Sequence, residues 1–145
     1  GPKEIINAIR KIQSQSTSNP SSISQAAAVE ALNGQQHFIK ERAEAFRERR
    51  DFIVNSLNNI KGINCLTPNG AFYVFPSCKE LLNKKTKLKT DTEFVQKLLE
   101  KSMVAVVQGS AFGLDGYFRI SYATSMENLK KAVTRIKDFC DSLNN

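Results

Sequence analysis

The sequence contains no apolar run long enough to span a membrane and no N-terminal pattern typical of a secretory signal peptide. We therefore expect a cytoplasmic protein with no membrane partner. The single histidine, His37, has no cysteine or second histidine at ligand spacing, which argues against a metal site. The three cysteines, Cys65, Cys78 and Cys140, are widely spaced and odd in number, so we expect reduced thiols that pack in the interior.

Acidic side chains are fewer than basic ones, 14 against 21, and the formal net charge at pH 7 is +7. The densest basic cluster lies within residues 79–89, which contain five lysines but no aromatic residue on which a nucleic-acid base could stack. We interpret this segment as a surface loop, the least ordered stretch of the chain, and expect no nucleic-acid partner. A basic module that binds polyanions stays an alternative, which salt-dependent retention on heparin or DNA would detect.

Apolar residues that recur at three- and four-residue steps predict helices over 1–13, 23–32 and 35–58. We expect the second helix to end in a left-handed cap near Gly34. In the third helix the same spacing predicts one apolar stripe, opposite a charged outward face, formed by Ile39, Ala43, Phe46, Ile53 and Leu57.

Two sequences of the capping-box form, Thr90–Glu93 and Thr124–Glu127, predict the starts of two further helices. In the first of these helices four apolar side chains should point inward: Phe94, Val95, Leu98 and Leu99. In the last helix a single core stripe is expected from Met126, Leu129, Val133, Ile136, Cys140 and Leu143.

Strands are predicted in the second half of the chain. Asn69-Gly70 is a strong tight-turn pattern, so we expect a hairpin between residues 63–66 and 71–75, with the aromatic side chains of the second strand packed in the sheet. Two more strands, 104–107 and 117–122, flank a glycine-rich loop. The fold class is therefore α+β, with a small antiparallel or mixed sheet packed against long helices that cover one of its faces.

Arg119 is the unusual residue of the last strand. Alternation along a strand places Phe118, Ile120 and Tyr122 on an apolar face, and Arg119 projects from the opposite face with its two hydroxyl-bearing neighbours. An arginine in a largely apolar segment needs an anionic partner, and its planar fork suits a carboxylate or a phosphate. A salt bridge within the protein, or a guanidinium that points to solvent, is an equally open explanation at this point.

Three separated strings of the sequence, VAVVQGSAFG, GYFRISYATS and PNGAFYVFP, resemble the C-terminal part of bacterial class I aspartate aminotransferases, which are fold-type I enzymes that use pyridoxal 5'-phosphate. The resemblance implies that Arg119 binds the α-carboxylate of the substrate. It also implies a parent enzyme that moves the amino group between L-aspartate and 2-oxoglutarate, with oxaloacetate and L-glutamate as products. The small-molecule partners would be an amino acid and an oxo acid.

The same resemblance implies a domain plan and a dimer. Residues 1–33 would be the end of the large domain and an interface connector, residues 34–60 a long interdomain helix, and residues 61–145 a small C-terminal α/β domain. The connector would lie at a homodimer interface, where Ser18 and Asn19 approach the active site of the partner subunit. The initial Gly1-Pro2 fits this family pattern and is equally consistent with a remnant of protease cleavage.

The chain departs from the family pattern in one decisive respect. It lacks the segment with the Schiff-base lysine and a phosphate-binding arginine, and it lacks the upstream residues that hold the pyridine ring. We therefore expect no catalytic residue and no cofactor-binding residue in this chain, which alone should be inactive. The second arginine of aspartate specificity is also absent, so a preference for aspartate alone or for aspartate with prephenate or aromatic substrates stays open.

Gln108 is a smaller departure, because the family usually has proline there; we expect a looser loop beside the pocket. A non-catalytic structural or regulatory domain, with Arg119 in an internal salt bridge, is the alternative to the enzyme.

Overall fold

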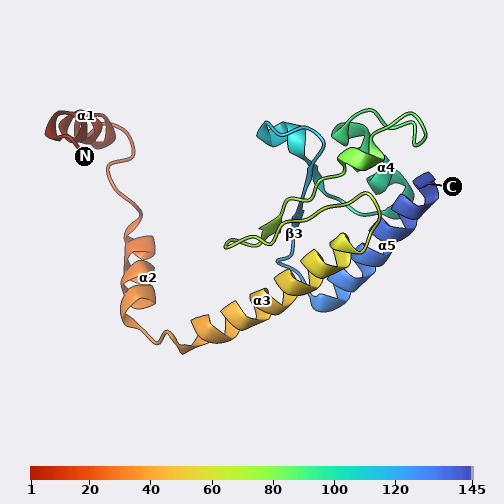
Figure 1. Cartoon of the computed structure of the whole chain (residues 1–145). Coiled ribbons are helices and arrows are strands. Elements are labelled where there is room, and N and C mark those ends of the chain that lie inside the picture. The colour runs from red at the N-terminus through yellow and green to blue at the C-terminus, as the bar shows by residue number, and fades with distance from the viewer. Residues whose placement is uncertain (145) are drawn as a thin grey trace. The chain divides into compact units, whose positions relative to one another are not determined.

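The computed structural model describes the backbone of residues 1–144 and the side chains of residues 1–143. The chain divides into two compact units, Gly1–Lys40 and Glu41–Asn145. Figure 1 shows the order of the elements along the chain, with helices throughout and the short strands confined to the second unit.

The first unit contains α1 (Lys3–Ser14) and α2 (Ser22–Asn33). The predicted apolar stripe of α1 is present, but its isoleucines are exposed, from 40% at Ile6 to 70% at Ile12. Gly34 ends α2 with its N–H donating to the Glu30 carbonyl at 2.7 Å. The predicted left-handed cap is wrong, because Gly34 has φ −75° and ψ −171°, which is extended backbone.

The long helix α3 spans His37–Asn58, two residues later at its start than predicted. Its apolar stripe is buried only toward the C-terminal end, where Ile53 and Leu57 are fully buried, whereas Ile39 is 51% exposed. Periodicity identifies the apolar face of a helix but does not show how much of that face is buried.

The sheet contains β1 (Tyr73–Val74), β2 (Val107–Gln108) and β3 (Phe118–Ser121). All pairs are antiparallel, and β3 lies in the centre of the order β1-β3-β2. The register sets Val74 opposite Ile120 and Val107 opposite Arg119. This arrangement confirms an α+β fold with a small antiparallel sheet, although each strand is shorter than the sequence pattern predicted.

The predicted hairpin between 63–66 and 71–75 is wrong, because β1 pairs with β3 and only an isolated bridge joins Asn64 to Ser77. The side chain of Asn58, at the end of α3, holds the segment before the turn. It accepts a hydrogen bond from the backbone N–H of Cys65 at 2.8 Å and donates to the Cys65 carbonyl at 2.9 Å. Asn64 uses its own N–H and carbonyl to bond Ser77, so this segment pairs beyond the predicted second strand.

Helix α4 (Asp91–Ser102) starts as its capping sequence predicted. The Thr90 hydroxyl accepts the Glu93 N–H at 3.1 Å, and the Glu93 carboxylate accepts the Lys89 N–H at 2.7 Å. One inward residue was predicted wrongly: Leu99 is 45% exposed, while Phe94 and Leu98 are fully buried.

Helix α5 (Met126–Asn144) is capped one residue later than predicted. Ser125, and not Thr124, accepts the backbone N–H of Asn128 at 3.1 Å, and the Asn128 side chain then donates to the Thr124 hydroxyl at 3.1 Å. Both hydroxyls are used, but the sequence pattern assigned them the wrong roles.

The core lies between the apolar face of β3 and the helices of the second unit. Phe118, Ile120 and Tyr122 are all buried, which confirms the alternation predicted for this strand. The Phe94 ring of α4 lies 5.1 Å from Phe118 and 5.5 Å from Phe139 of α5, measured between ring centroids. This aromatic contact joins the two helices to the centre of the sheet and leaves the opposite face of β3 for other contacts.

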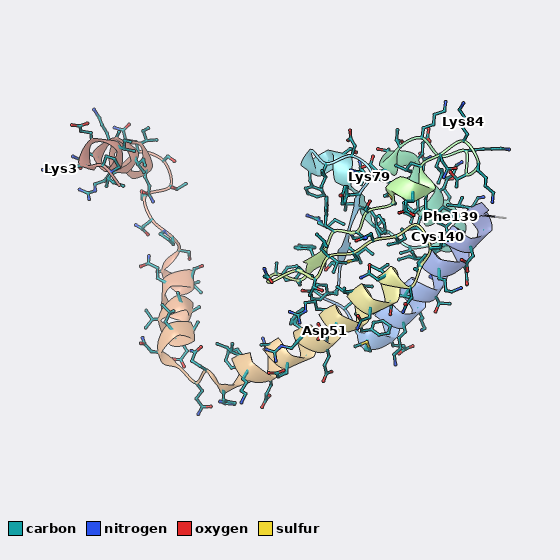
Figure 2. All side chains as sticks on the ribbon, in the orientation of Figure 1. Lys3, Asp51, Lys79, Lys84, Phe139 and Cys140 are labelled. Atoms are coloured by element: carbon teal, nitrogen blue, oxygen red, sulfur yellow. The ribbon has the colours of Figure 1, made fainter. Side chains whose placement is uncertain are left out.

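Residues 79–89 form a surface loop that is anchored at its ends. The 3-10 helix η1 (Lys79–Leu81) starts the segment, Leu88 is fully buried, and the Thr86 hydroxyl donates to the Leu81 carbonyl at 2.7 Å. Lys84 is exposed at the outer edge of this loop (Figure 2). That this is the least ordered stretch stays a prediction, although the lysine-rich composition did not indicate the buried side chains between the exposed lysines.

The three cysteines are free and buried, as predicted. Within the described residues, no cluster of three or more His, Cys, Asp or Glu side chains is arranged to hold a metal ion. Nor does any described helix combine the length and the apolar character that crossing a membrane requires.

Candidate functional site

Arg119 projects from the central strand on the side away from the core, as its alternation with buried neighbours predicted. Its guanidinium carbon lies 4.5 Å from the centroid of the Tyr73 ring and 4.4 Å from the centroid of the Phe112 ring. Tyr73 comes from β1, and Phe112 comes from the 3-10 helix η2 (Gly109–Phe112). The cation therefore lies between two aromatic rings contributed by segments on either side of β3, a favourable arrangement for a planar guanidinium.

Arg119 takes part in none of the ion pairs found among the described side chains. It borders a cavity of about 190 Å³ that Tyr73, Ala105, Val106, Val107 and Ser121 also line. The internal salt bridge required by the structural-domain alternative is thus not formed within residues 1–143. A half-buried guanidinium that has aromatic neighbours and no carboxylate partner is suited to bind an anion from outside.

The turn that carries Phe112 depends on glycine at its start. The Gly109 N–H donates to the Tyr117 carbonyl at 2.7 Å, which closes the loop between β2 and β3. A Cβ atom at this position would lie 2.8 Å from the Tyr117 carbonyl oxygen, so a larger residue would push the loop away from the strand. Gly113 ends η2 with φ +77°, a conformation that favours glycine.

A second aromatic layer continues from the Phe112 ring. Phe75 stacks on Tyr117 with centroids 5.7 Å apart and an interplanar angle of 12°, and it meets Phe112 at 6.0 Å. The Lys79 ammonium lies 4.8 Å from the Tyr117 centroid. These contacts connect the Phe112 ring beside Arg119 to Lys79 at the start of η1.

Gln108 precedes this turn and is paired with Phe118 in the sheet. Its φ of −62° is the value that proline requires, so the backbone conformation here suits either residue. The looser loop expected from glutamine stays a prediction.

Ser18 and Asn19 lie in the turn between α1 and α2, and both are exposed. Ser18 has φ +59°, and its N–H donates to the Gln13 carbonyl at 2.8 Å. Asn19 accepts a 3.5 Å hydrogen bond from the side chain of Gln25. Their contact with a partner subunit stays a prediction.

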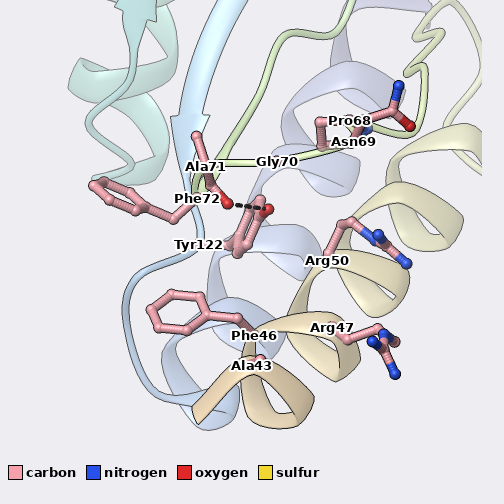
Figure 3. Close-up of a pocket in the computed structure, with 10 residues that line it drawn as sticks. All are labelled: Ala43, Phe46, Arg47, Arg50, Pro68, Asn69, Gly70, Ala71, Phe72 and Tyr122. Atoms are coloured by element: carbon pink, nitrogen blue, oxygen red, sulfur yellow. Dashed lines mark hydrogen bonds between the residues drawn. The ribbon is translucent and has the colours of Figure 1, made fainter. Parts of the chain in front are cut away.

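A larger cavity, of about 360 Å³, lies between α3 and the loop 68–72 (Figure 3). The Tyr122 hydroxyl donates to the Ala71 carbonyl at 2.9 Å and so holds this loop, in which Ala71 has φ +58°. Arg47 and Arg50 also line the cavity, but each is already ion-paired at 2.7 Å to a carboxylate of α3. This cavity is therefore a weaker candidate for binding an anion than the site at Arg119.

Sequence reasoning identified Arg119 but missed both of its ring partners. Tyr73 was expected to pack in the sheet, and no role was predicted for Phe112 in its loop. The alternation of residues 73 and 75 shows that they share a face, but the pairing of β1 with β3 is needed to place that face beside Arg119.

The chain was compared with known proteins. A family model described as aminotransferase class I and II matches residues 1–136. The aspartate aminotransferase of Rhizobium meliloti strain 1021 is 57% identical over 147 aligned residues, which cover 99% of this chain and 36% of that protein. A probable aspartate/prephenate aminotransferase of Rhizobium leguminosarum bv. phaseoli is 55% identical over 144 residues, covering 97% of this chain and 36% of the relative.

Solved structures agree with these matches. The crystal structure of the aspartate aminotransferase from Rhizobium meliloti has a TM-score of 0.90 at 57% identity and covers 97% of this chain. An alanine aminotransferase from Pyrococcus furiosus has a TM-score of 0.84 at 34% identity, also over 97% of this chain. This chain spans about a third of the length of each, 36% and 34%.

Proposed function

This chain belongs to the class I and II aminotransferase family, and from that membership we propose that it supplies the α-carboxylate site of an aspartate aminotransferase. The complete enzyme would move the amino group between L-aspartate and 2-oxoglutarate. The names of its relatives support aspartate as the amino donor, and some of them add prephenate. We propose a cytoplasmic homodimer, with Ser18 and Asn19 at its interface.

One observation carries this proposal: the Arg119 guanidinium lies between two rings, has no carboxylate partner among the described residues and borders a cavity. Both ring centroids lie within 4.5 Å of the guanidinium carbon, and these two contacts restrain the side chain while its N–H groups stay available to a ligand. Two parallel N–H groups match the two oxygens of a carboxylate. Arg119 would bind the α-carboxylate that every amino acid and oxo acid substrate carries, and would orient the carbon that reacts.

The residues around Arg119 do not fit pyridoxal 5'-phosphate on their own. This cofactor is held through a lysine amine, and no lysine is among the residues that line the Arg119 cavity. Lys79 reaches the same side of the sheet, but its ammonium lies against the Tyr117 ring. We therefore propose that the lysine and the cofactor site belong to the part of the enzyme that the relatives have and this chain does not span.

The proposal is tested by Arg119→Lys in the complete enzyme. Lysine keeps the charge but loses the fork, and a charge-assisted hydrogen bond is worth roughly 1.5–3 kcal/mol. With part of the ring contact also lost, kcat/KM should fall by roughly a hundredfold. The loss should affect every amino acid and oxo acid tested, since all carry an α-carboxylate, while folding and cofactor binding stay near normal.

Arg47→Lys is the matched control, because Arg47 is an exposed arginine with an ion pair on α3. It should leave kcat/KM unchanged. Unchanged specificity constants in Arg119→Lys, or a loss confined to dicarboxylic substrates, would mean that Arg119 does not bind the α-carboxylate.

A further inference from the structure

Asp91 is a buried carboxylate outside the cavity at Arg119. It is the first residue of α4, and only 3% of its surface is exposed. Its Oδ1 accepts the backbone N–H of Thr92 at 3.0 Å, and its Oδ2 accepts the backbone N–H of Ser110 at 2.7 Å. A buried charged group costs free energy unless it is well hydrogen-bonded. Both carboxylate oxygens of Asp91 are bonded, and one of these bonds joins Asp91 to a different segment of the chain.

The bond from Ser110 ties the start of η2 to the start of α4. The first N–H groups of a short helix have no partner within it, and the Asp91 carboxylate supplies one for Ser110. The other end of the turn is closed by its own backbone, where the Gly113 N–H donates to the Ser110 carbonyl at 3.1 Å. Phe112 lies between these two points, and its ring lies 4.4 Å from the guanidinium of Arg119.

Phe112 has little else to hold its position. Phe112 is 49% exposed, and the contacts of its ring among the described residues are with the Phe75 ring and with the Arg119 guanidinium. The location of the ring is therefore set mainly by the backbone of η2, which Asp91 anchors to α4.

We propose that Asp91 is a positioning residue. It anchors η2 so that the Phe112 ring stays on the Arg119 guanidinium, and this contact keeps the N–H groups of Arg119 oriented to receive a carboxylate before the substrate binds. This inference rests on the proposed function of Arg119. It concerns binding of the α-carboxylate, which is held in the ground state and in the transition state alike, so a loss should raise KM more than it lowers kcat.

The test uses Asp91→Asn in the complete enzyme, because asparagine keeps the shape and one acceptor oxygen but removes the charge. We expect KM for both the amino acid and the oxo acid to rise about two- to fivefold, which is the loss of affinity expected when one partly exposed ring-to-guanidinium contact is lost. The kcat should stay within about twofold of that of the unmodified enzyme. Phe112→Leu, at an exposed position that should tolerate the change, is expected to raise both KM values by a similar factor.

The double variant Asp91→Asn/Phe112→Leu tests whether Asp91 acts through the Phe112 ring or whether its replacement weakens substrate binding in another way. If Asp91 acts through this ring, Asp91→Asn should raise KM no further in the Phe112→Leu background. Thr90→Ala is the matched control, because Thr90 caps the same helix through Glu93 and has no bond to η2. It should lower the melting temperature but leave both KM values unchanged.

Three results would overturn the positioning role: additive effects in the double variant, an equal rise of KM in Thr90→Ala, or a fall of kcat with KM unchanged. Arg119→Lys distinguishes this failure from failure of the proposed function. If Arg119→Lys weakens all substrates and Asp91→Asn does not, only the role of Asp91 is wrong. If Arg119→Lys has no effect, the carboxylate site itself is wrong.

Discussion

The two rings on Arg119 can be removed together without changing any charge, in the variant Tyr73→Leu/Phe112→Leu of the complete enzyme. Leucine fills much of the same volume and keeps the surface apolar. The guanidinium keeps its charge and its five N–H donors but loses both of its aromatic neighbours. If the rings preorganise the fork, the α-carboxylate should bind more weakly.

The expected magnitude follows from the geometry. Both centroids lie within 4.5 Å of the guanidinium carbon, and Arg119 is half-buried. A contact of this kind at a partly exposed site is worth about 0.5–1 kcal/mol. The two together amount to about 1–2 kcal/mol, or roughly a 5- to 30-fold loss of affinity. This is smaller than the loss expected for Arg119→Lys, which also removes the fork.

The assay is steady-state transamination with several amino acid and oxo acid pairs, together with equilibrium binding of a carboxylate that does not react. The same factor should appear for every substrate. Phe72→Leu controls for loss of aromatic packing around Tyr73, because the Phe72 ring lies 4.5 Å from the Tyr73 ring, measured between centroids, whereas the rings on Arg119 are Tyr73 and Phe112. Unchanged carboxylate binding in the double variant would refute the reasoning that the rings orient the guanidinium.

Four further outcomes are expected. The 145-residue chain mixed with pyridoxal 5'-phosphate should show no stoichiometric, borohydride-trappable label at one lysine and no aspartate-dependent oxaloacetate; labelling with turnover would contradict this. Sedimentation of the chain at micromolar concentration should show a monomer or a weak associate, and a tight dimer would be the opposing result. Phe94→Ala should destabilise the second unit by about 3–5 kcal/mol in a denaturant titration, whereas Leu99→Ala, at a 45% exposed position, should cost far less. Burial raises the pKa of the Cys78 thiol from 9.0 to about 12, so the unfolded chain releases this proton at lower pH than the folded chain does. The free energy of unfolding should therefore fall as pH rises from about 9 to 12. Cys78→Ala should lessen that fall, and an identical fall in the variant would contradict this prediction.

Local patterns in the sequence predicted much of this fold. The helices were found within about two residues, because apolar spacing and capping residues act over a few neighbouring positions. The buried face of β3 followed from strict alternation, and Arg119 was noticeable because an arginine there interrupts an apolar segment. The resemblance of three motifs to the aminotransferases was also a property of the sequence, and the family match confirms it.

The site at Arg119 was decided by contacts between distant residues. Tyr73 reaches it because β1 pairs with β3 in one register, and Phe112 reaches it because η2 is closed against Tyr117 and bonded to Asp91 of α4. The hairpin that a local turn pattern favoured is likewise replaced by the pairing of β1 with β3 and of Asn64 with Ser77. The sequence by itself determined which residues are helical, buried or charged. Only the tertiary structure decided which of them meet, because pairing register and side-chain hydrogen bonds join residues that no local pattern connects.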